Sequence, residues 1–183
     1  MKKIIAITAL FLSGNFVLKA QVFKSKKDEV KVTFFSTTPI EDISAVHSTS
    51  TSVIVNDSIK FSLSNTGFVF PKPLMQEHFN ENYMESPKYP KSTFKGKIEN
   101  VSSIQLGKDG SYPVVIKGTL DMHGVSKPVT ANATFVVKGG AISATSKLKV
   151  LLADYNISVP AVVKDNIAKE VEISISADYS IFK

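Results

Sequence analysis

The sequence predicts an all-β protein, a closed antiparallel barrel of about eight strands with a short helical lid segment. Three observations carry this prediction. Apolar and polar residues alternate with a period of two along most of the chain, which is typical of antiparallel sheets with one dry face. The links between the alternating segments are short, so neighbouring strands are expected to pair in sequence order. One segment, LMQEHFNENYMESPKYP (residues 74–90), interrupts the alternation with acids, amides, methionines and aromatics.

The first 20 residues have the pattern of a secretory signal peptide. A basic start leads into a short apolar run at residues 4–12, and the small Ala20 precedes an expected cut at Gln21. The run is too short to span a bilayer comfortably. We therefore expect residues 1–20 to be removed, and residues 21–183 to form one exported domain, periplasmic or secreted. No cysteine is present, which excludes disulfides and a lipid-modified cysteine anchor.

The charge of the chain argues against nucleic-acid binding. The formal net charge of +6 falls to +3 when Lys2, Lys3 and Lys19 leave with the signal peptide. Every basic residue other than histidine is lysine, and the chain has no arginine. Nucleic-acid readers favour arginine, whose planar fork binds bases and phosphates in two places. We expect a solvated lysine-rich surface and no nucleic-acid partner.

The alternating segments define the expected strands. In residues 58–65, for example, Ile59, Phe61 and Leu63 share one face while serines and a lysine share the other. The predicted strands cover residues 30–37, 43–56, 58–65, 92–101, 112–123, 128–138, 141–152 and 170–182. Short stretches with glycine read as hairpin turns at residues 107–112, 123–128 and 138–140. Closure of such a meander removes the exposed sheet edges.

Several positions on the predicted inner face carry small residues, namely Ala131, Ala133, Ala144, Gly96, Gly118 and Ala177. Small residues between larger apolar ones leave space inside a barrel. A barrel of this size either holds one small ligand or fills itself with side chains, and the pattern only mildly favours the cavity.

Two segments break the alternation. Residues 73–79 are expected to form a short helix, and residues 154–166 are interrupted by Pro160. The first segment carries many large apolar side chains, including Leu74, Met75 and Phe79. Loops seldom carry so many unless they cover a core or a pocket. Two interpretations stay open: a plug that closes the barrel, and a lid over an apolar ligand.

The residues offer little for catalysis or metal binding. His78 lies beside Glu77 and three residues before Glu81, but no second histidine follows at the spacing of zinc proteases. A solvated acidic face is the expectation. His123 precedes a glycine in a predicted turn, and His47 lies in a polar stretch where exposure to water is expected. There is no cysteine nucleophile and no G-x-S-x-G elbow. We expect no enzyme, no metal and no cofactor.

Three stretches nevertheless resemble a known family. They are PLMQEHFNENYMESPKYPKSTFKGKI (residues 73–98), GTLDMHGVSKPVT (residues 118–130), and LADYNISVP followed by KEVEISISADY (residues 152–179). They are similar to the motifs of the YceI-like family of exported polyisoprenoid-binding proteins. The resemblance extends from about residue 30 to the C-terminus.

The resemblance implies a lipocalin-like barrel, a helical segment near His78 and a long apolar cavity. It implies an isoprenoid ligand, such as a quinone tail or a polyprenyl lipid, and no known catalytic activity. A homodimer is compatible with the sequence. The alternative is a structural or interaction module with a filled barrel and a protein partner. Large apolar residues expected to face the ligand are Phe34, Phe61, Leu63, Phe68, Met75, Phe79, Met84, Phe94, Ile116, Phe135, Leu148 and Ile173.

Overall fold

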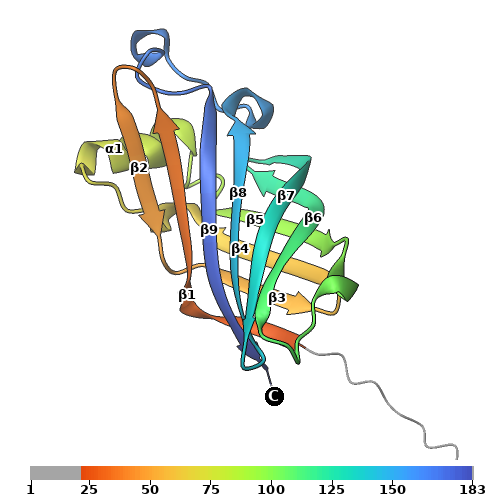
Figure 1. Cartoon of the computed structure of the whole chain (residues 1–183). Coiled ribbons are helices and arrows are strands. Elements are labelled where there is room, and N and C mark those ends of the chain that lie inside the picture. The colour runs from red at the N-terminus through yellow and green to blue at the C-terminus, as the bar shows by residue number, and fades with distance from the viewer. Residues whose placement is uncertain (1–21, 183) are drawn as a thin grey trace, which may run out of the picture.

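The computed structural model describes residues 22–182 and contains one antiparallel sheet that closes on itself (Figure 1). Nine strands follow the order β2-β1-β3-β4-β5-β6-β7-β8-β9, and β1 also pairs with β9. The strands are β1 (Val22–Thr37), β2 (Asp42–His47), β3 (Thr51–Val55), β4 (Ser58–Ser64), β5 (Lys91–Ile98), β6 (Gly110–Met122), β7 (Val125–Lys138), β8 (Ala141–Leu151) and β9 (Glu170–Ile181). The predicted signal peptide, residues 1–20, lies outside the described residues.

The closed barrel has eight strands, as predicted, because β2 and β3 both pair with β1. Strand β2 pairs with the second half of β1 and β3 pairs with its start. The ring then runs from β1 through β3 to β9 and back to β1. Between Ser25 and Val30 the register of β1 against β9 shifts, and such irregularities bend a strand. The bend divides β1 between the two ends of the molecule.

The hairpin turns confirm two of the three predicted glycine turns. His123–Gly124 and Gly139–Gly140 have positive φ at both residues, the backbone that tight two-residue hairpins require. The third prediction was wrong in detail. Strands β5 and β6 are joined by a longer connection that contains the 3₁₀ turn η3 (Val101–Ser103), and Gly110 already belongs to β6.

The predicted helix is present and lies beside the barrel near β2 (Figure 1). Helix α1 (Pro73–His78) begins with proline at its first position, where the missing N–H costs nothing and the fixed φ suits a helix. It continues into the π-helical turn η2 (Phe79–Tyr83). Side chains brace the turn: Asn80 Nδ2 donates to the Gln76 carbonyl at 3.0 Å, and Ser86 Oγ donates to Asn80 Oδ1 at 2.7 Å. We call residues 73–84 the lid.

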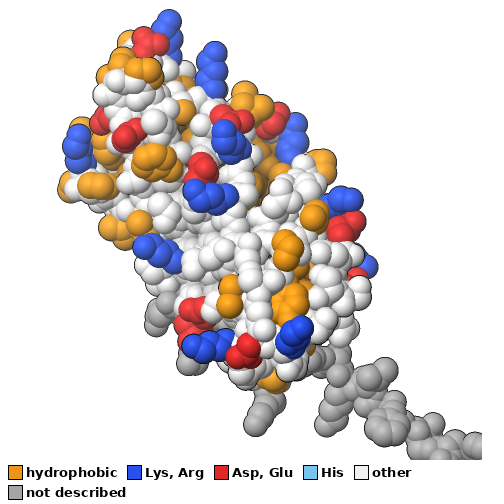
Figure 2. Space-filling model, in the orientation of Figure 1, with side chains coloured by type: hydrophobic (Ala, Val, Ile, Leu, Met, Phe, Trp, Pro, Cys, Tyr) orange, Lys and Arg blue, Asp and Glu red, His pale blue; other side chains and the backbone are white. Residues whose placement is uncertain are grey.

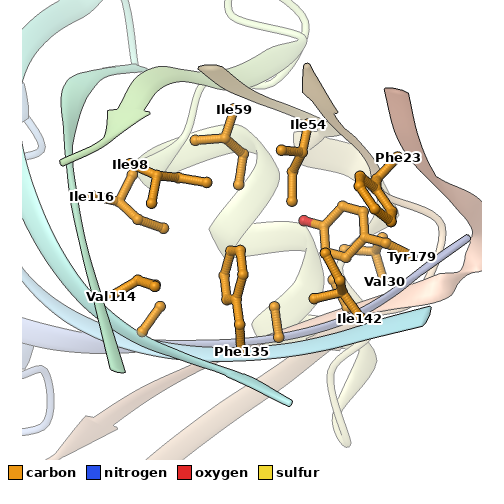
Figure 3. Packing of buried hydrophobic residues seen from close by; sticks show 13 residues of the cluster. Phe23, Val30, Ile54, Ile59, Ile98, Val114, Ile116, Phe135, Ile142 and Tyr179 are labelled. Carbon is orange, nitrogen blue, oxygen red and sulfur yellow. The ribbon is translucent and has the colours of Figure 1, made fainter. Parts of the chain in front are cut away.

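The half of the barrel near Val22 and Phe182 is filled by apolar side chains that converge from several strands (Figure 3). Phe135 is 1% exposed and stands in the middle of this cluster. The Gly96–Gly118 pair on β5 and β6 lies beneath the Phe94 ring, since a Cβ at either glycine would approach Phe94 Cζ to 2.6 Å. The two glycines therefore create no free space; they give Phe94 room to lie flat against the wall.

Candidate functional site

A cavity of about 390 Å³ lies between the filled half of the barrel and the lid. Its size falls within the range of small-molecule sites, about 300–1,000 Å³. Most of its lining side chains are apolar, and they come from β1, β2, β4–β9, the lid, and the segments before the lid and between β8 and β9. Ala131, Ala133, Ala144 and Ala177 are among them, so four of the six small residues named from the sequence border open space, whereas Gly96 and Gly118 do not.

All twelve residues named from the sequence line this cavity: Phe34, Phe61, Leu63, Phe68, Met75, Phe79, Met84, Phe94, Ile116, Phe135, Leu148 and Ile173. Five of them are buried, and the other seven are half-buried although they face inward. Inward side chains keep such exposure when they border open space instead of packed neighbours. Their contact with a ligand stays a prediction.

Phe79 docks the lid onto the barrel. Its ring stacks on Phe34 at 5.5 Å between centroids, and it meets Phe68 at 5.4 Å and Phe70 at 5.1 Å. Aromatic pairs at these separations add about 0.5–1.5 kcal/mol each beyond the area that they bury. Met75, Tyr83 and Met84 also line the cavity. Leu74 does not, and its side chain is 60% exposed.

A few polar groups interrupt the apolar wall, and the buried ones Asn65, Ser92 and Tyr179 have hydrogen-bond partners. Asn65 is fully buried; its Nδ2 donates to the Tyr89 carbonyl at 2.6 Å, and its Oδ1 accepts from Ser92 Oγ at 2.7 Å. Deeper in the barrel, the Tyr179 hydroxyl lies 2.7 Å from Ser52 Oγ. Burial raises the pKa of the Tyr179 phenol to about 12, and the hydrogen bond with Ser52 opposes this shift. A wall of this kind suits an apolar chain better than a charged ligand.

The mouth of the cavity is bordered by the β1–β2 turn, the lid and the segment between β8 and β9. Glu41 connects the three. Its Oε1 lies 3.6 Å from Lys72 Nζ, and its Oε2 accepts from Asn166 Nδ2 at 3.3 Å. Glu41, His78 and Asn166 are cavity-lining residues that carry polar groups at the mouth.

The three histidines lie apart from one another, and each has different surroundings. His78 is exposed at the mouth, and Glu77 and Glu81 beside it are exposed and do not line the cavity. Within residues 22–182, no group of three His, Asp or Glu side chains could hold a metal ion. His123 is buried in the β6–β7 turn, with Nδ1 2.8 Å from the Tyr155 carbonyl and Nε2 2.9 Å from Glu85 Oε2.

The expectation that His47 faces water was wrong, since the side chain is fully buried. The Thr49 N–H donates to Nδ1 at 3.2 Å, so the ring proton is on Nε2, which donates to the Ser64 carbonyl at 2.9 Å. Burial lowers the pKa of His47, and the bond to Ser64 opposes that shift. The neutral ring occupies the break between β2 and β3, and a Cβ at Gly67 would approach its Nε2 to 2.3 Å.

Sequence reasoning missed the polar and loop residues of the cavity wall. Ser36, Asn65 and Ser92 belong to segments that have the pattern of ordinary strands. No local feature of the sequence indicates that these three residues face a cavity. The loop residues Val163 and Ile167 also line the cavity. The only local signal for them was the second break in the alternation, around Pro160.

The fold is shared with solved structures of low sequence identity. A polyisoprenoid binding domain from Saccharophagus degradans, implicated in plant cell wall breakdown, superposes with a TM-score of 0.77 at 13% identity, covering 87% of this chain and 98% of that one. BcnA from Burkholderia cenocepacia gives a TM-score of 0.66 at 16% identity, covering 85% and 99%. The YCEI protein of Campylobacter jejuni gives 0.54 at 19% identity, covering 69% and 72%.

A search of curated proteins finds no match. None of the helices within residues 22–182 is long and apolar enough to cross a membrane. The protein-family model for the YceI-like domain matches residues 23–179 of the sequence, which is nearly the whole barrel. The barrel, the lid and this match agree with the three motifs in the sequence, and the chain belongs to the YceI-like family.

Proposed function

We propose that this protein is an exported, non-catalytic binding protein that carries or sequesters a long-chain isoprenoid lipid, of quinone or polyprenyl type, in the barrel cavity. The observation that carries the proposal is the apolar cavity beneath the lid, bordered by all twelve side chains named above. Transfer of apolar surface from water supplies the driving force, at roughly 25 cal/mol per Å² buried. The description of the Saccharophagus degradans domain as polyisoprenoid binding supports the class of ligand.

The apolar cavity wall should select a lipid by its hydrocarbon chain more than by its head group. Asn65 and Ser92 already bond each other, so they offer a ligand few free polar groups. The alternative, a filled barrel that serves as an interaction module, fits the half of the molecule around Phe135 but leaves the cavity unexplained. Absence of catalysis fits the exposed, isolated position of His78 at the mouth.

The test is organic extraction and mass spectrometry of the protein purified without detergent from its own exporting host. We expect a co-purified isoprenoid, and an added isoprenoid should raise the melting temperature of the delipidated protein. Absence of lipid in repeated preparations, together with no thermal shift, would refute the proposal. Cell fractionation and N-terminal sequencing test export and the cut before Gln21, and light scattering tests whether the protein is a homodimer.

A further inference from the structure

Three exposed apolar side chains surround the mouth of the cavity. Ile40 in the β1–β2 turn is 64% exposed, Leu74 in α1 is 60% exposed, and Val162 in the 3₁₀ turn η5 (Ala161–Val163) is 91% exposed. Each of them immediately precedes a residue that lines the cavity. We call these three residues the rim. They extend the apolar character of the cavity to the outside of the molecule.

The rim residues lie on segments that are tied to one another. Glu41 reaches both Lys72, two residues before Leu74, and Asn166, four residues after Val162. A second bond, from the Ala168 N–H to Ser36 Oγ at 2.9 Å, holds the η5 segment against β1. The three rim residues therefore lie on segments that polar contacts hold together at the mouth.

We propose that this end of the barrel docks on the surface of a lipid bilayer, so that the cavity opens onto the membrane. This inference rests on the proposed function, because a water-insoluble chain enters or leaves most easily where the cavity meets a lipid phase. Single apolar side chains on loops can insert at the boundary between head groups and acyl chains. The aliphatic stems of Lys72 and Lys164, next to the rim, suit the same boundary, with the ammonium groups reaching water and head groups.

The composition of this end favours a bilayer over a protein partner. Figure 2 shows hydrophobic side chains there interspersed with lysines and acids, without one broad apolar patch. Stable protein interfaces bury a contiguous, well-packed surface. The lysines near the rim are offset by Glu41, Asp42 and Asp165, so the end carries no strong net charge. Docking should therefore depend on apolar insertion, and only weakly on salt and on anionic lipid.

The described ends of the chain leave the rim uncovered. Val22 and Phe182 lie together at the opposite end of the barrel (Figure 1), where the Phe182 N–H donates to the Val22 carbonyl at 2.8 Å. That end and the outer face of β7 also carry exposed apolar residues, Phe182 at 61% and Val136 at 43%. These two positions provide a matched control, because they are apolar and exposed but distant from the mouth.

The experiment is flotation of the mature protein with phosphatidylcholine vesicles at low and high salt. Combined substitution of Ile40→Ser, Leu74→Ser and Val162→Ser should weaken vesicle binding by about tenfold or more, while Val136→Ser with Phe182→Ser should leave it unchanged. All three rim side chains are exposed, so the variant should keep the parent's melting temperature. Equal loss in both variants, or no vesicle binding by the parent, would overturn the proposal.

Uptake of a fluorescent polyprenyl probe separates this inference from the proposed function. The rim variant should take up the probe from cyclodextrin as the parent does, but extract it from vesicles more slowly. If the parent takes up the probe from cyclodextrin and does not float with vesicles, docking is refuted and lipid binding stands. If it floats but takes up no probe from either source, lipid binding is refuted. If the rim substitutions change the oligomeric state instead, the rim is an interface between copies of this chain and the bilayer proposal fails.

Discussion

His47 shows how one buried polar side chain can specify a turn in a barrel wall. One ring nitrogen contacts the carbonyl of Ser64 at the end of β4. The other contacts the Thr49 N–H and the Ser50 hydroxyl, between β2 and β3. The ring also packs edge-on against Phe68, with 5.2 Å between the ring centroids. The strand therefore changes direction where the imidazole can satisfy backbone groups that the sheet leaves unpaired. The sequence contains the histidine but no local sign of its burial, because the partners come from three segments.

The stability of the fold should decrease on acidification through His47. Burial lowers its folded-state pKa below the unfolded value of 6.5. Below pH 6.5 the histidine binds a proton more readily in the unfolded chain than in the folded protein. The free energy of unfolding therefore falls as the pH drops from 6.5 to the folded-state pKa, and this group does not affect it above pH 6.5. Urea unfolding at a series of pH values should show a smaller loss in His47→Gln than in the parent. The exposed His78→Gln serves as control, and identical pH profiles for His47→Gln and the parent would contradict the assignment.

Ionisation of Tyr179 should lower the stability of the fold at alkaline pH. Its phenol has a folded-state pKa of about 12 against an ordinary value of 10.0, so the unfolded chain releases the proton first. Stability from this group is fully present below pH 10 and is lost as the pH rises towards 12. Tyr179→Phe should unfold less steeply with pH in that window, and ultraviolet titration should lose one late-ionising tyrosine. Parallel alkaline unfolding of parent and variant would argue against a buried phenol.

At the scale of elements, the strands and the helix were predictable and the irregular pieces were not. Period-two alternation located the strands, and proline with the following apolar residues indicated α1. The single strand predicted at residues 43–56 was wrong, because the chain breaks there into β2 and β3, which pair with different parts of β1. The start of β1 at Val22 was missed, because the polar stretch after Ser25 coincides with the register shift against β9. The π-helical turn η2 was also missed, since its geometry depends on side-chain bonds such as Ser86 to Asn80, which form only when the lid packs.

The lid should be held chiefly by Phe79. Phe79→Ala removes contacts with three aromatic rings, and because the side chain is only half-buried we expect a cost of about 1–3 kcal/mol in unfolding free energy. Loss of the anchor should also speed exchange of a bound fluorescent lipid, measured by stopped-flow transfer between the protein and detergent micelles. Leu74→Ala in α1, at the start of the lid, removes a mostly exposed side chain and should change neither stability nor exchange with micelles. A stable Phe79→Ala variant with unaltered exchange would show that the lid does not gate the cavity.

At the scale of the whole molecule, closure divides the interior into a filled half and an open half. Large side chains around Phe135 fill the end near Val22 and Phe182. Alanines on β7, β8 and β9, three of which pack in the same cluster, border the cavity that extends from there towards the lid. Eight of the twelve residues lie on strands and were predictable because alternation fixes the face of a strand residue once the fold class is known. The other four, Phe68, Met75, Phe79 and Met84, were predictable only from the apolar character of the segment that interrupts the alternation. The volume that the twelve residues enclose was not predictable, since it depends on how the Phe94 ring lies over Gly96 and Gly118 and on loops that approach from distant parts of the chain.

Filling the open half distinguishes a lipid-binding barrel from an interaction module. Ala131 on β7 is 8% exposed and lines the cavity, so Ala131→Leu extends three carbon atoms into space that the fold does not occupy. Burying those atoms without displacing neighbours should leave the melting temperature of the delipidated protein unchanged or raise it by about 2–4 °C. The same atoms should obstruct an isoprenoid chain, and uptake from cyclodextrin should fall by about tenfold or more.

Thr130→Leu, on the adjacent outward-facing position, adds similar bulk outside the barrel and should leave uptake intact. Normal uptake by a folded Ala131→Leu protein would mean that the chain does not pass this point, and equal loss in both variants would place the effect outside the cavity.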